Sequence, residues 1–103
     1  MLHPEFKAQL PLITQLFKDK KVKRAYAFGS LVTDRFNDES DIDLLITFED
    51  GLEPLEKGEM WWDLHDGIRD IFNREVDLLT ESSLKNPYFI EELNEKKELI
   101  YAA

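Results

Sequence analysis

The sequence contains no cysteine and fewer basic than acidic residues, and each shortage excludes a class of function. Without thiols there are no disulfide bridges and no thiolate metal sites, so we expect no zinc centre. Thirteen basic residues stand against twenty-two acidic ones, and the net charge of −9 leaves no basic surface for stable binding of DNA or RNA. No apolar run has the length of a membrane span or a signal segment, so we expect no membrane association and a cytoplasmic location.

Length and composition describe one small folded domain. The chain has 103 residues, of which 43% are hydrophobic and 12% aromatic, enough for one modest core. We therefore treat residues 1–103 as a single domain, with no separate substrate domain. The acidic excess would suit a basic protein partner, although acidic chains are often simply well solvated. The sequence leaves open whether the chain forms a homo-oligomer.

The most informative stretch runs from residue 25 to residue 48 and reads AYAFGSLVTDRFNDESDIDLLITF. A first apolar run ends in Gly29-Ser30, and after ten residues a second apolar run opens with Asp-Ile-Asp at residues 41–43. Side chains alternate along a strand, so Asp41 and Asp43 share one face. Two neighbouring carboxylates repel each other, and hard oxygen ligands of this kind suit Mg²⁺ or Mn²⁺ together with substrate phosphates.

The Gly29-Ser30 turn supplies the second part of a site. A small-residue turn after a strand exposes backbone N–H groups that can hold a phosphate. Taken alone, an Asp-x-Asp is most often a solvated strand end, and a Gly-Ser pair is a common turn. The two together, each at the end of a strand-like run and separated by a polar loop, favour a metal–nucleotide site.

This spacing resembles the signature of a known family. Gly29-Ser30, ten residues and then Asp-Ile-Asp at 41–43 are similar to the motif of the polymerase-beta-like nucleotidyltransferase superfamily, and Phe28 and Ser40 also fit. The length resembles the minimal nucleotidyltransferases in particular. In one place the chain departs from the family: where a small residue, an arginine and a glycine commonly follow the serine, it has Val-Thr-Asp and then Arg35. We therefore consider Arg35 as a further nucleotide contact and leave open whether this loop still supports nucleotide binding.

The resemblance also implies roles for individual residues. It implies a third carboxylate on a later strand, and Asp77, in EVDLLT at residues 75–80, lies where the family has it. By this resemblance Asp41 and Asp43 bridge two Mg²⁺ ions, with Mn²⁺ as an alternative. Asp77 completes the ion on the nucleophile side and helps to deprotonate the attacking hydroxyl. Ser30 and the Gly29 turn hold the terminal phosphates of ATP or another nucleoside triphosphate.

The family resemblance further implies a function. Minimal members occur as partners of HEPN-type proteins in two-component toxin–antitoxin systems, where they attach AMP to a tyrosine of the toxin. We therefore expect an enzyme, a metal-dependent nucleotidyltransferase that moves AMP from ATP to a hydroxyl of a protein acceptor, as the antitoxin of a HEPN/MNT pair. One alternative is a catalytically silent protein that neutralises a toxin by contact. Another is a structural domain whose acids are accidental.

Hydrophobic periodicity predicts an α/β (α+β) fold: a small mixed sheet of three to four strands with helices packed on it. Pro11 interrupts the first helix, either by a kink or by a restart at Leu12. Trp62 falls outside the apolar stripe of its helix and is either a partly exposed ring over the sheet edge or a partner contact. The expected elements are a helix before residue 22, a strand at 22–28, a short helix from Leu31, a loop at 33–40, a strand at 41–48, a loop at 49–59, a helix at 60–73, a strand at 75–80 and a helix from Pro87 to Ile100.

Overall fold

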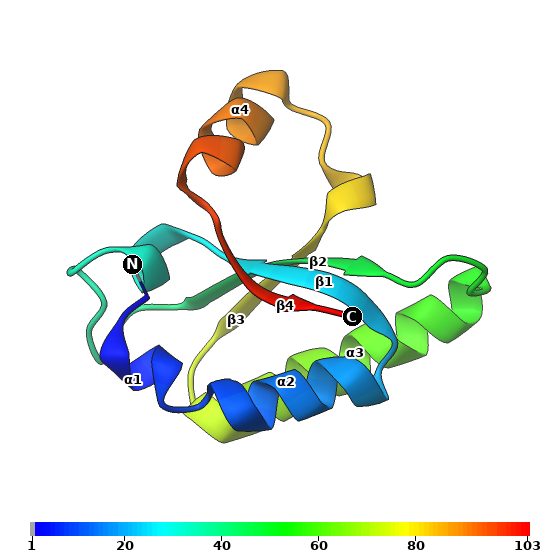
Figure 1. Cartoon of the computed structure of the whole chain (residues 1–103), viewed down its shortest axis with the longest axis horizontal. Helices are drawn as coiled ribbons and strands as arrows, with labels where there is room; N and C mark the ends of the chain where they lie inside the picture. Colours follow the sequence, from blue (N-terminus) through cyan, green and yellow to red (C-terminus); the bar gives the residue numbers. More distant parts are fainter. Residues whose placement is uncertain (1) are drawn as a thin grey trace.

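Figure 1 shows the computed structural model, which describes residues 2–103. Among these residues, no helix is long and apolar enough to cross a membrane. Short 3-10 helices, η1 (Gly29–Val32) and η2 (Glu81–Ser83), follow the first and third strands. The α-helices and strands come in the order α1 (Pro4–Lys7), α2 (Leu10–Asp19), β1 (Val22–Ala27), β2 (Ile42–Phe48), α3 (Pro54–Phe72), β3 (Val76–Thr80), α4 (Pro87–Lys96) and β4 (Glu98–Ala102).

The strands form one mixed sheet in the order β3-β2-β1-β4. β1 pairs antiparallel with β2 on one side and with β4 on the other, while β2 and β3 run parallel. Parallel neighbours need a crossover connection, which α3 provides. The predicted class, a small mixed sheet of three to four strands with helices packed on it, is confirmed.

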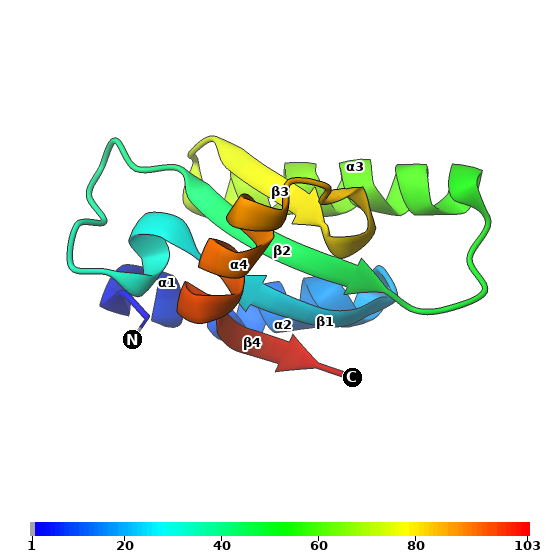
Figure 2. The ribbon, with the colours of Figure 1, turned by 90° about the horizontal axis from the view of Figure 1, so that it is seen from above.

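The two faces of the sheet are covered unequally. α2 and α3 lie on one face, whereas α4 lies by itself over the other (Figure 1 and Figure 2). Since side chains alternate along a strand, the burial of residues 42, 44 and 46 of β2 in the core turns residues 43, 45 and 47 toward the α4 face. The fully buried residues between the sheet and α2 and α3 include Ile13, Phe17, Ile42, Leu44, Ile46, Leu64 and Ile68.

Two helices begin at places that the sequence does not predict. α3 begins at Pro54 rather than at Met60, because a proline at the first helical position loses no hydrogen bond. Gly58, which reads as a loop residue, is tolerated inside the helix. Pro11 likewise lies in the first turn of α2, which begins at Leu10, so the chain breaks before this proline instead of kinking or restarting at it.

The C-terminal segment is a strand where a continued helix is expected. α4 ends at Lys96, and Glu98–Ala102 form β4, which pairs with β1 from Ala27↔Glu98 to Arg24↔Ala102. The prediction that Ile100 belongs to the last helix is therefore wrong. Pairing with the edge of β1 satisfies backbone groups of the segment, and its Leu-Ile-Tyr run fits a half-buried pleated surface.

Trp62 projects from α3 into solvent. Its side chain is 60% exposed, and its ring meets the ring of Trp61 edge-on at 4.8 Å between centroids. Trp61 in contrast is partly buried and donates its indole N–H to the carbonyl oxygen of Leu78 at 3.1 Å. The expected exposure of Trp62 is confirmed, and its role as a partner contact stays a prediction.

Candidate active site

Two of the predicted carboxylates stand side by side where β2 and β3 begin. The strands are parallel and in register, so Asp43 pairs with Asp77. The register is fixed at the start of both strands, where the N–H of Ile42 donates to the carbonyl oxygen of Glu75 at 2.9 Å. Paired residues of neighbouring strands point to the same face and lie about 5 Å apart. The fold thus brings together two residues that are separated in the sequence by the whole of α3.

The electrostatics of Asp43 reflect this crowding. Burial, and then the negative charges of Asp77 and Asp41, raise the pKa of Asp43 from 3.8 to about 6. Asp41 and Asp77 are exposed, whereas Asp43 is half-buried. Ionisation of Asp43 is therefore less favourable in free energy than that of an ordinary aspartate, and a cation between the carboxylates would make it more favourable.

The Gly29 turn lies directly against Asp43. The N–H of Phe28 donates to the backbone carbonyl oxygen of Asp43 at 3.2 Å, which continues the β1–β2 pairing up to the turn. Gly29 has φ +64°, and a Cβ atom at this position would stand 2.4 Å from Oδ2 of Asp43. Glycine is favoured here both by the backbone conformation and by the close approach of the carboxylate. Ser30 follows in η1, so the predicted phosphate turn and the predicted carboxylates form one site.

A cavity of about 710 Å³ adjoins this turn, a size in the ordinary range for small-molecule sites. The aspartates do not line it, and Phe28 and Gly29, which line the cavity and contact Asp43, join the two. α4 provides the opposite wall, which the sequence did not indicate. From the side of β1, η1 and the following loop the cavity is lined by Phe28, Gly29, Ser30, Val32, Thr33 and Arg35, and from the α4 side by Phe89, Glu92, Leu93, Lys96 and Glu98.

The carboxylates suit a hard divalent cation in donor type but do not form a complete cage. Within residues 2–103, no three His, Asp or Glu side chains are grouped closely enough to hold a metal ion by themselves. Mg²⁺ is usually bound through one or two carboxylates together with substrate phosphates, so a complete cage is not required. Asp43 and Asp77, with Asp41 near them, provide the carboxylates, and the adjacent turn is where phosphates would enter. The metal-binding and catalytic roles of these residues stay predictions.

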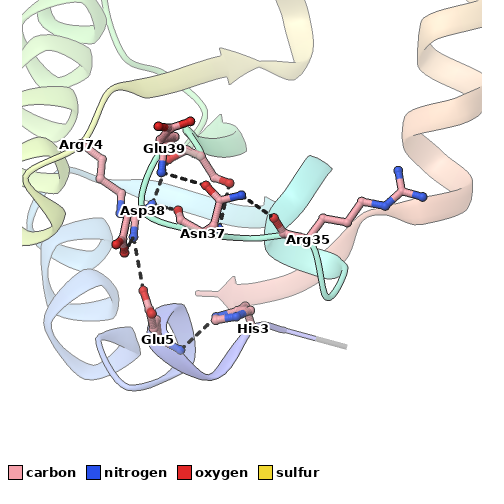
Figure 3. Close-up of polar contacts among 8 residues, drawn as sticks. His3, Glu5, Arg35, Asn37, Asp38, Glu39 and Arg74 are labelled. Atoms are coloured by element: carbon pink, nitrogen blue, oxygen red, sulfur yellow. Dashed lines mark hydrogen bonds and ion pairs between the residues drawn. The ribbon is translucent and has the colours of Figure 1, made fainter.

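An arginine that the sequence did not single out braces the loop between the turn and Asp41. Arg74 follows α3 and contacts the backbone of this loop, while Arg35 extends away from it toward the α4 side (Figure 3). The hydrogen-bonding partners of Arg74 in the loop are more than thirty positions away from it in the sequence. No local spacing pattern reports such a contact, so only the fold reveals it.

Comparison with known proteins agrees with this geometry. The family model described as polymerase beta, nucleotidyltransferase matches residues 12–103. Two proteins of Methanocaldococcus jannaschii that carry the inferred name protein adenylyltransferase are similar: one is 34% identical over 94% of both chains, the other 33% identical over 84% of both. The chain therefore belongs to the polymerase beta nucleotidyltransferase family, and it is a nucleotidyltransferase.

Solved structures share the fold. A minimal nucleotidyltransferase, so named by inference, superposes with a TM-score of 0.69 at 23% identity and covers 95% of each chain. A chain from the complex of tri-AMPylated Shewanella oneidensis HEPN toxin with MNT antitoxin superposes with a TM-score of 0.64 at 19% identity, over 94% of this chain and 72% of that one. A chain from a toxin–antitoxin structure with AMP-PNP reaches 0.70 at 21% identity, over 91% and 73%. The expected nucleotidyltransferase-like architecture is thus confirmed.

Proposed function

We propose that this nucleotidyltransferase transfers AMP from ATP to a hydroxyl group of a protein, with divalent metal ions, and serves as the antitoxin of a HEPN-type toxin. The observation that carries the proposal is the pairing of Asp43 with Asp77 directly beside the Gly29 turn. Nucleotidyl transfer makes a chiefly electrostatic demand, because charge develops on the entering and leaving oxygens and must be neutralised.

Asp41 and Asp43 are the residues that would hold both metal ions, and Asp77 would hold the one on the nucleophile side. Two bound Mg²⁺ ions, with Mn²⁺ as an alternative, would stabilise negative charge on the reacting phosphate and on both flanking oxygens. In the transfer, the acceptor hydroxyl oxygen bonds to the α-phosphorus, the bond from that phosphorus to the bridging oxygen breaks, and pyrophosphate leaves. Asp77, exposed at the strand edge, accepts the proton of the acceptor hydroxyl.

The nucleotide would lie between the turn and α4. Gly29 and Ser30 face the terminal phosphates, and the cavity beside them has room for the nucleoside. Its walls supply two aromatic rings, Phe28 and Phe89, and the cationic side chain of Arg35. Aromatic faces suit base stacking, and the cation suits the phosphate charge. The departure of this loop from the family pattern is therefore compatible with nucleotide binding.

Three observations support a protein acceptor. The similar Methanocaldococcus proteins carry the name protein adenylyltransferase, and the similar folds include chains of complexes between toxins and antitoxins. The net charge of −9 opposes stable binding to a nucleic acid and suits a basic protein. The exposed position of Asp77 leaves the nucleophile side of the site open to an acceptor brought by a second protein.

The test is transfer of ³²P from α-labelled ATP, with Mg²⁺, to the product of the neighbouring gene, which the proposal expects to be a HEPN-type protein. Asp43→Asn and Asp77→Asn are the site variants, and Asp50→Asn is the matched control because Asp50 is 96% exposed and lies beyond the other end of β2. We expect label on the partner with the wild type and the control, and none with the site variants. Label that persists in both site variants would refute the assigned roles.

The catalytically silent antitoxin remains the second candidate, and the observation in its favour is the loop after Ser30, where Val-Thr-Asp and Arg35 stand in place of the family pattern. The two functions differ in one experiment. If Asp43→Asn still binds the toxin but no longer protects cells from it, transfer is the mechanism. If protection survives the substitution and no nucleotide gives label, contact alone is the mechanism.

A further inference from the structure

We propose that Arg74 is a positioning residue that holds the loop of residues 33–41 against the edge of the sheet and thereby sets the place of Asp41 beside the other two carboxylates. The catalytic importance of the position of Asp41 rests on the proposed function, but the contacts of Arg74 with the loop do not depend on it. Nothing in the spacing of the sequence assigns a role to this arginine.

The guanidinium of Arg74 joins two segments that are remote in the sequence. Nη1 donates to the backbone carbonyl oxygens of Asn37 and Ser40, the latter at 3.1 Å. Nη2 donates to Oε2 of Glu5 in α1 at 3.3 Å and stands 3.7 Å from Oδ1 of Asp38. Figure 3 shows these contacts converging on one side chain from the loop and from α1. The side chain of Arg74 is only 12% exposed, so these bonds are partly shielded from water.

The face of the same guanidinium covers a buried ring. Cζ of Arg74 lies 4.4 Å from the ring centroid of Phe36, a loop residue that is 5% exposed. The imidazole ring of His3 packs against Phe36 at 4.9 Å between centroids. The loop is therefore anchored through a side chain at its middle as well as through its carbonyl groups.

Only arginine meets all of these contacts at once. Its planar fork carries five N–H donors and offers a flat face to an aromatic ring. A lysine could keep one ion pair but could not serve two carbonyl groups, a carboxylate and a ring together. Arg74→Lys should therefore restore only part of what a neutral substitution removes.

The link to Asp41 lies in the chain on both sides of it. Ser40, which accepts from Arg74, precedes Asp41, and Ile42, which donates to the carbonyl oxygen of Glu75 at 2.9 Å, follows it. The two adjacent residues 74 and 75 thus hold Asp41 from both flanks. Since β3 begins one residue later, the same segment also fixes the start of the strand that carries the third carboxylate.

The loop offers a direct probe of the brace. The backbone N–H of Asn37 donates to Oγ of Ser40 at 3.0 Å, and the backbone N–H of Ser40 donates to the backbone carbonyl oxygen of Asn37 at 3.0 Å. If the loop loses its brace, these amides should exchange faster. Hydrogen exchange of the metal-free protein, followed by mass spectrometry on peptides covering residues 33–41, measures this without any substrate.

The experiment compares Arg74→Gln and Arg74→Lys with Arg69→Gln, in which an arginine five residues earlier loses an ion pair to Glu75. Arg69 is 56% exposed and lines the same surface hollow as residues 38–41, but its ion pair is to the side chain of Glu75 and not to the loop. Its substitution therefore matches the loss of charge and leaves every contact of Arg74 in place. Three quantities are measured: loop exchange, Mn²⁺ affinity by electron paramagnetic resonance, and kcat and KM for ATP in the label transfer.

For Arg74→Gln we expect loop exchange about 10-fold faster, because at least one charge-assisted hydrogen bond to the loop is lost. We expect Mn²⁺ affinity and kcat to fall by about 10- to 100-fold, as for other residues that orient metal ligands. KM for ATP should change less than kcat, since Arg74 does not itself line the nucleotide cavity, although Thr33 and Arg35 at the start of the loop do. Arg74→Lys should lie between Arg74→Gln and the wild type, and Arg69→Gln should match the wild type.

Two results would overturn the proposal. One is loop exchange in Arg74→Gln equal to that of Arg69→Gln. The other is faster loop exchange with Mn²⁺ affinity within twofold of the wild type, which would mean that the brace does not place Asp41. Failure of the proposed function looks different, because the wild type itself would then give no label while the exchange and Mn²⁺ measurements still report on Arg74.

Discussion

Gly29→Ala tests the close approach on which the site depends. Gly29 has φ +64°, where a residue with a side chain is strained by about 1–2 kcal/mol. The new methyl carbon would also stand 2.4 Å from Oδ2 of Asp43, a separation that atoms do not adopt, so the carboxylate must move. The strain predicts a loss of thermal stability of roughly 4–8 °C for each kcal/mol in a domain of this size.

The displaced carboxylate should affect activity far more than stability. A misplacement of about 1 Å at a reacting centre can reduce a rate about 100-fold, and we expect a loss of that order in label transfer by Gly29→Ala. The variant should nevertheless remain folded at room temperature.

Gly51→Ala is the matched control. Gly51 also has positive φ, +85°, but a Cβ atom there would meet nothing within 4 Å. The control should share the backbone strain, and hence a similar fall in Tm, while keeping its activity. If Gly29→Ala matched Gly51→Ala both in Tm and in transfer rate, the contact with Asp43 would have no functional consequence and the reasoning would be refuted.

Three further predictions follow from the core, the titration of the site and the metal. Asp43→Asn should raise Tm of the metal-free protein at pH 8 and leave it unchanged near pH 4. Because the pKa of Asp43 is raised to about 6 in the folded protein, its ionisation opposes folding. The contribution of Asp43 to stability is therefore fully present below pH about 4 and is lost as pH rises through 6; equal Tm differences at both pH values would contradict this. Leu64→Ala, at a fully buried position, should lower the free energy of unfolding by about 2–5 kcal/mol in urea denaturation, whereas Leu55→Ala, 78% exposed, should change it by less than about 0.5 kcal/mol. Chelation of divalent ions with EDTA should abolish label transfer and added Mn²⁺ should restore it, and transfer that continues in EDTA would exclude the metal roles of the three aspartates.

The parts of the site that the sequence predicts are those encoded by short-range patterns. The alternation of residues 41–43 placed two carboxylates on one face, and a Gly-Ser pair after an apolar run marked the turn. Asp77 was found through the family resemblance, and the parallel register then brought it beside Asp43. For the paired aspartates and the turn a local rule of backbone geometry was sufficient, whereas Asp77 needed the resemblance.

The parts that were missed depend on contacts between distant segments. β4 was predicted as helix because an apolar spacing continues past Leu93, and only the free edge of β1 turns that segment into a strand. Arg74 was missed because its carbonyl partners lie in another loop, and a lone arginine carries no periodic signal. The wall that α4 adds to the cavity was missed for the same reason.

Helix α4 lies apart from the helices that form the core, so the residues that stabilise the fold differ from those that line this wall of the cavity. Leu93 is the one buried residue of α4, so this helix contributes little to the core that α2 and α3 form on the opposite face. The helix is connected to the sheet at both ends, through η2 after β3 and directly to β4. Residues 87–96 can therefore diverge, or be exchanged in the laboratory, at small cost to folding while the shape of the cavity proposed for the nucleotide changes. In this family's small format, new substrate preferences could arise by replacing ten residues and leaving the carboxylates where they are.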